Sequence, residues 1–404
     1  MVLDNEFGLH TGEVVHHSRY IQSHLFFVPS QMKASKRGGG MVVLALLSIS
    51  LFLGLGAVRP AAAVPSCTVG SYCGTVYVST VFSGVDDIPF TYVQATQTLT
   101  WGTDNILASH LQGGQSDGLI FDTVTHNLMV GVNCYGPASI VEISPTTGAV
   151  MSTVSTGGVS PSHLIADQQG NAWASSDGCP TDSPAVQIPL PASTSTVTTH
   201  AITGSTNFVN TLIFTSSKTT AFYTATPCCA GGGQFGTIDL TTFVTTCAKA
   251  VTGGCASFPA AHGGTFDPYT GDVIIFGGDH VTQINPATLA VVSDLTVAGA
   301  GFDQGTVDGS GHLFVAGGPG VFFLDYRSSG LVSSAGNYMA ASICNPSCTG
   351  GGADDVAPLV GPGSPVLGAP EFPLGLFALF AVAVPILLVL KTRYSGSLHA
   401  KAAT

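Results

Sequence analysis

Charge is scarce in this chain. Of its 404 residues only 8% are Asp, Glu, Lys or Arg, whereas soluble domains carry roughly 25%. Between residues 64 and 370 the basic residues are Lys218, Lys249 and Arg327, against 19 Asp and Glu, which gives that segment a formal charge of −16. Clustered Lys and Arg are what bind nucleic acids and anionic lipid headgroups. We therefore expect no nucleic-acid partner, and the composition disfavours an anionic lipid surface.

Two widespread catalytic signatures are also missing. The chain contains neither an HExxH metalloprotease motif nor a GxxxxGK[ST] P-loop. The run Gly231-Gly-Gly is interpreted as a flexible loop and not as a phosphate cradle. Gly, by contrast, is abundant, with 51 residues, as is typical of short strands joined by tight turns. The sequence therefore indicates an architecture more directly than a reaction.

The N-terminal region predicts export. A basic stretch at residues 33–37 precedes the apolar residues 41–57, and alanines at 61–63 offer the small residues that a signal peptidase requires. We expect a signal peptide over residues 32–63. Residues 1–31 are then a mis-called leader or a short cytosolic extension. An uncleaved anchor helix over 41–57 is the alternative.

The C-terminal region predicts an anchor. Residues 373–390 carry no charge and are followed by a Lys and an Arg, a length that just spans a bilayer with cations that favour a cytoplasmic end. We expect a transmembrane helix there, a cytoplasmic tail over 391–404 and a Gly/Pro tether over 361–372. The intervening domain, residues 64–360, would then lie at the extracellular face of the cell membrane.

The sequence Pro370-Glu371-Phe372-Pro373 stands directly before this apolar stretch. Together with the basic end, it resembles the PEF-CTERM class of sorting signals. That resemblance implies a sortase-like processing enzyme as a partner and a mainly archaeal distribution. A simple C-terminal membrane anchor is the alternative.

The centre of the chain repeats one pattern five times. Each copy runs from a short apolar strand through an Asp- or Gly-marked turn into a second strand, a variable loop and a third strand. The first strands end at Asp122, Asp167, Thr215, Asp267 and Asp308, spaced 45, 48, 52 and 41 residues apart. Strand repeats of this length predict an all-β fold, a β-propeller with four-stranded blades.

A sixth inner strand is expected at residues 351–359, where no room remains for a full blade. The N-terminal part would supply its outer strands, at residues 75–81, 90–93, 98–101 and 105–111. Strands from both termini would thus close the ring. We predict six blades, with seven as the alternative, and place Asp86-Asp87 in a loop.

Two turns carry a family resemblance. Ile143-Ser-Pro-Thr-Thr-Gly148 and Ile284-Asn-Pro-Ala-Thr288 resemble the Asp-Pro-x-Thr-Gly turns of YVTN and NHL-type propellers, with Ser or Asn in place of Asp. The resemblance covers most of residues 100–360. It implies the fold and hardly a function.

All ten cysteines fall inside the predicted exported segment, an even number that favours disulfides over a metal site. The predicted pairs are Cys67 with Cys73, Cys134 with Cys179, Cys344 with Cys348, and Cys228 or Cys229 with Cys247 or Cys255.

Polar residues gather at the points where the chain enters each inner strand, which lie at one face of a propeller and form its axial mouth. These residues are Asp117, His163, Asn210, His262, Asp303 with Gln304, and Asp354 with Asp355. The loops between second and third strands return to the same face and add Asn133, Tyr135, Asp177, Asp279 and His280.

Three roles are open for the mouth. The polar residues could cap backbone groups and hold water. Asp117, His163, His262 and Asp303 could bind one divalent metal, Ca²⁺ or, because of the two imidazoles, a transition metal. His163 or His262 could act as a catalytic base. The ring resembles, in position only, those of lactonase, gluconolactonase and virginiamycin B lyase propellers.

Three functions follow from these roles. The first is a surface-anchored module that binds a small ligand or cell-surface components through Asp117, His163, Asn210, His262, Asp303, Gln304 and Asp354. The second is an extracellular metal-dependent hydrolase or lyase that uses the same mouth. The third is a structural component of a surface coat.

Overall fold

The computed structural model describes residues 67–81, 84–133, 138–176, 184–227, 233–341 and 352–360. The chain divides into two units, residues 1–59 and 60–404, and every described residue lies in the second. The expected leader, signal peptide, tether, transmembrane helix and tail lie outside the described residues. Within the described ranges, no helix is long and apolar enough to cross a membrane.

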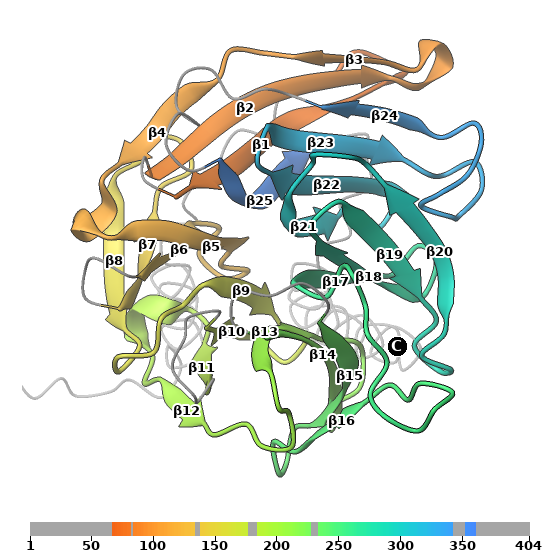
Figure 1. Ribbon diagram of the computed structural model, residues 1–404. Coiled ribbons are helices and arrows are strands. Elements are labelled where there is room, and N and C mark those ends of the chain that lie inside the picture. Colours follow the sequence, from red (N-terminus) through yellow and green to blue (C-terminus); the bar gives the residue numbers. More distant parts are fainter. Residues whose placement is uncertain are drawn as a thin grey trace, which may run out of the picture. The chain divides into compact units, whose positions relative to one another are not determined.

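Six antiparallel sheets form the described part of the chain, each one blade of a propeller (Figure 1). The strands of each blade are given from the innermost outward. Blade 2 consists of β5 (Gln115–Phe121), β6 (Leu128–Asn133), β7 (Ser139–Ile143) and β8 (Val150–Ser155). Blade 3 consists of β9 (His163–Ala166), β10 (Asn171–Ser175), β11 (Ala185–Pro189) and β12 (Thr198–His200), and blade 4 of β13 (Phe208–Ile213), β14 (Thr220–Thr226), β15 (Gln234–Asp239) and β16 (Thr245–Cys247). Blade 5 consists of β17 (Gly263–Asp267), β18 (Asp272–Gly277), β19 (His280–Ile284) and β20 (Val291–Thr296). Blade 6 consists of β21 (Phe302–Val307), β22 (His312–Gly317), β23 (Gly320–Asp325) and β24 (Tyr338–Ala341).

Blade 1 is closed by strands from both ends of the described chain, as predicted. Its strands are β25 (Ala353–Val360), β1 (Ser71–Thr80) and β2 (Gly84–Val93), with β3 (Thr98–Trp101) and β4 (Asn105–Ser109) both paired to β2. The helical turns of the described ranges are three short 3₁₀ segments, η1 (Gln94–Thr96), η2 (Leu111–Gly113) and η3 (Ala192–Thr194). The prediction of six blades is confirmed, and the alternative of seven is not needed.

The turns between first and second strands form as their Asp residues predict. Asp122 Oδ1 accepts hydrogen bonds from the backbone N–H groups of Val124 (2.7 Å) and Thr125 (3.0 Å). Asp308 Oδ1 accepts from Ser310 N (2.7 Å) in the equivalent turn of blade 6. A carboxylate that satisfies turn amides in this way fixes where one strand ends and the next begins.

The core consists of six apolar clusters, one between each pair of neighbouring blades. The cluster between blades 6 and 1 stacks aromatic rings. Phe314 packs on Phe90 (5.2 Å between centroids) and on Phe323 (5.2 Å). The inner strands are apolar runs because blades contact them on both faces, which explains why they lack strict alternation.

One loop prediction is wrong. Asp86 and Asp87 lie within β2, where they pair with Val78 and Tyr77 of β1 and with Ile106 and Asn105 of β4. Two consecutive Asp residues favour turns by intrinsic propensity, but pairing on both sides of β2 overrides that preference.

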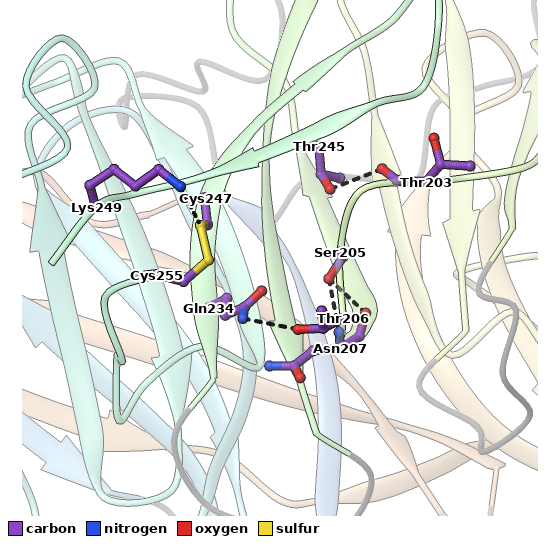
Figure 2. The surroundings of a disulfide bond; sticks show 9 residues. All are labelled: Thr203, Ser205, Thr206, Asn207, Gln234, Thr245, Cys247, Lys249 and Cys255. Atoms are coloured by element: carbon purple, nitrogen blue, oxygen red, sulfur yellow. Dashed lines mark hydrogen bonds between the residues drawn. A yellow bond between two sulfur atoms is a disulfide. The ribbon is translucent and has the colours of Figure 1, made fainter. Parts of the chain in front are cut away.

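Two disulfides lie in the described ranges. Cys67 bonds to Cys73 as predicted, and Cys247 bonds to Cys255 (Figure 2). The second pair corrects the prediction that Cys228 or Cys229 would bond to Cys247 or Cys255. After β16 the chain turns back, so that Lys249 and Cys255 form a β-bridge and bring the two sulfurs together. The other six cysteines lie outside the described residues.

Candidate functional site

The inner strands β5, β9, β13, β17, β21 and β25 surround the centre of the ring (Figure 1). Each carries one of six predicted polar residues at or beside its first residues. We call these six the mouth residues: Asp117, His163, Asn210, His262, Asp303 and Asp354. They belong to six different blades, and the contacts described next join all six into one group.

Two histidines and one carboxylate form the tightest part of this group. One ligand atom each of His163, His262 and Asp303 lies within 4.8 Å of the others. His262 Nε2 is 2.6 Å from Asp303 Oδ1. The two imidazoles meet edge to face, with centroids 4.9 Å apart. His163 is 2% exposed, whereas the side chains of His262 and Asp303 are 28% and 22% exposed, so solvent reaches the latter two.

In the amide orientation of this structure, Asn210 selects one tautomer of His262. Its amide nitrogen Nδ2 lies 2.8 Å from His262 Nδ1 and also donates to Thr226 Oγ1 at 2.9 Å. Because an amide nitrogen only donates, His262 Nδ1 accepts, and the ring proton sits on Nε2, where it faces Asp303. Asn210 is fully buried, and its Oδ1 has no hydrogen-bond partner among the described residues.

Hydroxyl groups on second strands hold these backbones in place. Ser175 Oγ of β10 donates to the carbonyl oxygen of Asn210 in the next blade. Thr224 Oγ1 of β14 donates in the same way to the carbonyl oxygen of His262. Each mouth residue concerned is therefore positioned by the preceding blade, which makes the site rigid.

Three carboxyl groups share the other side of the mouth. Asp354 lies between Asp117 and Asp303 and hydrogen-bonds to both. Burial, and then the charges of Asp117 and Asp303, raises the pKa of Asp354 well above 3.8. Burial acts to raise the pKa of Asp303, but the electrostatic attraction of His262 and hydrogen bonds from Asp354 and His262 outweigh it, so that this pKa lies below 3.8. Asp354 thus holds a proton while Asp303 stays negative.

Gln304 and Asp355 stand one residue after mouth residues, and their side chains serve the backbone. Gln304 Oε1 accepts from Gly264 N (2.8 Å) of the neighbouring blade and from Gly305 N (3.1 Å). Asp355 accepts from Leu119 N (2.9 Å) of blade 2 and from Val356 N (2.8 Å). These contacts clamp adjacent blades together and give both residues a structural role.

Two of the predicted residues from loops between second and third strands are described, and both bond outside the group of mouth residues. His280 Nδ1 bonds to Asp294 Oδ2 (2.9 Å) within blade 5, and Asp279 Oδ1 accepts from Gly301 N (3.5 Å). Tyr135, Asp177 and the side chain of Asn133 lie outside what the structure describes.

The segment Gly114-Gln-Ser116-Asp-Gly118 matches the Gly-x-Ser-x-Gly pattern of hydrolase nucleophiles. In those enzymes the Ser sits on a sharp turn between a strand and a helix. Here Ser116 lies inside the inner strand β5 and is 1% exposed. It therefore lacks the geometry of a nucleophile.

The group of His163, His262 and Asp303 fits a divalent transition metal. Ligand atoms around such an ion stand about 3–4 Å apart when each lies about 2 Å from it, close to the spacing found here. Imidazole nitrogens favour a transition metal over Ca²⁺. Asp117, the fourth expected ligand, lies outside this group and bonds to Asp354.

The chain matches no family model and no curated protein. Solved structures match at low identity: a gluconolactonase from Xanthomonas campestris (14% identity, 74% of this chain and 91% of that one, TM-score 0.42), a luciferin-regenerating enzyme (13%, 60% and 88%, 0.37) and hydrazine synthase from Kuenenia stuttgartiensis (12%, 67% and 80%, 0.39). At these identities and TM-scores, the matches carry no argument about function or site.

Proposed function

We propose that this propeller is a metal-dependent hydrolase or lyase whose site is the mouth. The observation that carries the proposal is the convergence of His163, His262 and Asp303 within 4.8 Å. These residues come from three different blades, and the polar network of Asn210 and Asp354 surrounds them. Imidazole suits transition metals such as Zn, Cu, Fe and Ni, so two imidazoles and a carboxylate at one point favour such a metal.

The amide of Asn210 supports this role for His262. When Nε2 binds a metal, the imidazole proton has to sit on Nδ1, and an acceptor beside Nδ1 stabilises that tautomer. Half a turn of the Asn210 amide presents the buried Oδ1, which is without a partner in the described ranges, to Nδ1–H. Asn210 can thus serve His262 in both states.

A bound divalent metal would supply Lewis acidity toward a carbonyl oxygen or lower the pKa of a water molecule. The residues of this chain do the rest. His163 and His262 would each offer one imidazole nitrogen to the metal, and Asp303 would offer a negatively charged carboxylate oxygen. Asp354 keeps a proton on its carboxyl group because of its burial and its two acidic neighbours, and that proton is available to a leaving group.

The substrate is expected to be neutral or weakly charged. The basic residues in the described ranges are Lys218, Lys249 and Arg327. Arg327 binds Asp325, Lys249 contacts Cys247, and Lys218 lies in the turn between β13 and β14, at the opposite end of β13 from Asn210. No cation of this set stands at the mouth to bind a polyanion. A lactone or an uncharged ester fits this charge pattern.

Metal analysis tests the proposal directly. We expect about one divalent transition metal per chain and loss of ester or lactone hydrolysis on chelation. His163→Ala and Asp303→Asn should abolish stoichiometric binding, and Asn210→Ala should weaken metal affinity about 10- to 100-fold. His280→Ala is the matched control, because it removes an imidazole from blade 5 outside the group. Wild-type protein that binds no metal after reconstitution would exclude the proposed site.

The second candidate is a metal-free binding module. The observation that favours it is that both ring nitrogens of His262 contact protein groups, Nδ1 the Asn210 amide and Nε2 the Asp303 carboxylate. Such a module would show thermal stabilisation by a small polar ligand that is insensitive to chelators. In that case His163→Ala would weaken binding of the ligand, and neither the wild-type protein nor the variant would bind a stoichiometric metal.

We also propose that the domain is exported and anchored by its C-terminus. The uncharged residues 373–390 and the basic-apolar start at residue 32 support this location. The disulfides Cys67–Cys73 and Cys247–Cys255 support it independently, because such bonds persist in oxidising compartments. Cleavage of the domain by protease added to intact cells is the expected result, and complete protection would contradict it.

A further inference from the structure

The Cys247–Cys255 disulfide closes an exposed hairpin on the face of the propeller that carries the mouth. Cys247 ends β16, the outermost strand of blade 4, and the chain then crosses the same face to reach β17. Cys247 is partly buried, but Cys255 and the hairpin tip from Val251 to Gly254 are exposed. A thiol reagent can therefore reach the sulfur of Cys255 from solvent.

A rare cation stands beside this disulfide. Lys249 Nζ lies 3.7 Å from Cys247 Sγ (Figure 2). Lys249 is one of three basic residues between residues 64 and 370, so a cation beside any given sulfur is not expected from composition. A neighbouring ammonium stabilises a thiolate relative to a thiol and makes that sulfur the better leaving group.

The hairpin leads directly into the short segment that ends at His262, one residue before β17. Ala256 N donates to Ala248 O (2.7 Å) across the hairpin. Phe258 then pairs with Gly233 of blade 4 through two backbone hydrogen bonds of 2.9 Å, and its ring packs on Phe235. Seven residues after Cys255 comes His262. The disulfide therefore fixes one end of the segment whose other end is a mouth residue.

We propose that the Cys247–Cys255 disulfide is a thiol-exchange site that controls the order of the segment leading to His262. The reductant is a dithiol. One thiolate of the dithiol attacks Cys255 Sγ, the bond between the two cysteines breaks, and Cys247 leaves as a thiolate beside Lys249. The mixed disulfide joins one sulfur of the dithiol to Cys255 Sγ. The second thiolate of the dithiol attacks the dithiol sulfur of this bond, closes the dithiol into a cyclic disulfide and releases Cys255 as a thiolate. Two electrons pass to the protein, and the dithiol becomes a disulfide.

The other described disulfide provides an internal comparison. Cys73 is buried, with 6% of its surface exposed, so attack on the Cys67–Cys73 bond has less access. Treating the folded full-length chain with dithiothreitol and alkylating at intervals, followed by mass spectrometry of each cysteine peptide, measures both rates in one sample. We expect Cys247 and Cys255 to become alkylated before Cys67 and Cys73.

Two lysine variants test the part played by Lys249. Lys249→Met should slow opening of Cys247–Cys255 about two- to fivefold and leave Cys67–Cys73 unchanged, because only one leaving thiolate loses its cation. Lys218→Met, which removes the other lysine of the described ranges, should change neither rate. Equal effects of Lys249→Met on both disulfides, or no effect on either, would overturn the proposal.

Amide hydrogen exchange tests the connection to the mouth. In the folded protein the His262 N–H donates to Phe276 O at 2.8 Å. After selective reduction, we expect faster exchange from Ala256 to His262 and no change in β5, which belongs to blade 2 and not to blade 4 or 5. Unchanged exchange in 256–262 would overturn the coupling. This readout needs no metal, so its result stands apart from that of the metal analysis.

Discussion

Asp355 clamps the closing blade, and its removal is expected to destabilise the propeller. Its carboxyl group is fully buried and accepts backbone hydrogen bonds from Leu119 of blade 2 and from Val356 of its own strand. Asp355→Ala leaves both N–H groups without an acceptor. Each buried unpaired donor costs about 1–3 kcal/mol, so the loss of two acceptors should lower the free energy of unfolding by about 2–6 kcal/mol.

Urea denaturation followed by tryptophan fluorescence measures this loss. Asp87→Ala is the control, since Asp87 belongs to the same blade but makes only a side-chain contact of 3.4 Å with Asn105, and its loss should stay below about 1 kcal/mol. If Asp355→Ala proves no more destabilising than this control, then the amides of Leu119 and Val356 find other acceptors. The role of the clamp in closure would then be refuted.

The pH dependence of the same difference has a definite sign. Burial raises the pKa of Asp355 well above 3.8. A carboxyl group whose pKa is higher in the folded than in the unfolded protein contributes its full stability below the unfolded value, and that contribution is lost as pH rises through the folded value. The destabilisation caused by Asp355→Ala should therefore be largest near pH 4 and smaller at higher pH.

Three further substitutions probe the packing. Tyr326→Phe removes a buried 2.8 Å hydrogen bond to Asp267 and should reduce the free energy of unfolding by about 1–2 kcal/mol, measured by urea titration. Phe314→Ala opens a cavity between blades 6 and 1 and should cost about 3–5 kcal/mol, with a lowered melting temperature in calorimetry. Gly131→Ala places a Cβ 2.0 Å from Pro161 O of the next blade and should lower the free energy of unfolding by about 1–3 kcal/mol. The same calorimetric scan measures this loss, and an unchanged melting temperature would show that the two blades can move apart there.

The repeat register predicted most of the fold because a propeller is a periodic structure. Once the first-strand ends of five copies are aligned, the blade length and the place of each inner strand follow. The incomplete sixth copy at residues 351–359 then required strands from the other terminus. That copy is β25, and β1 from the N-terminal side pairs with it. Periodicity carries this information because each blade buries its neighbour with the same pattern of apolar residues.

The departures lie where the pattern is not periodic. Asp86 is buried within β2 of the closing blade, which has a strand order of its own, so the repeat could not place it. The Cys247–Cys255 hairpin is an insertion between blades 4 and 5, and its pairing depends on a local chain reversal that brings Lys249 beside Cys255, which the register of the repeat does not encode. Register alone also cannot tell a side chain that faces the mouth from one used by a neighbouring backbone, as Gln304 shows.

The same limit explains why the mouth residues could be located but not assigned roles. Alignment puts Asp117, His163, Asn210, His262 and Asp303 at equivalent positions, and symmetry alone would give them equivalent surroundings. Their chemistry differs because neighbours differ: an amide beside His262 sets its tautomer, and a carboxyl group beside Asp303 carries a proton that lets Asp303 stay negative. The functional asymmetry of the ring thus arises from pairs of adjacent blades. A double-mutant cycle between Asn210 and His262 on metal affinity measures such a pair, and we expect coupling there but none between Asn210 and His280.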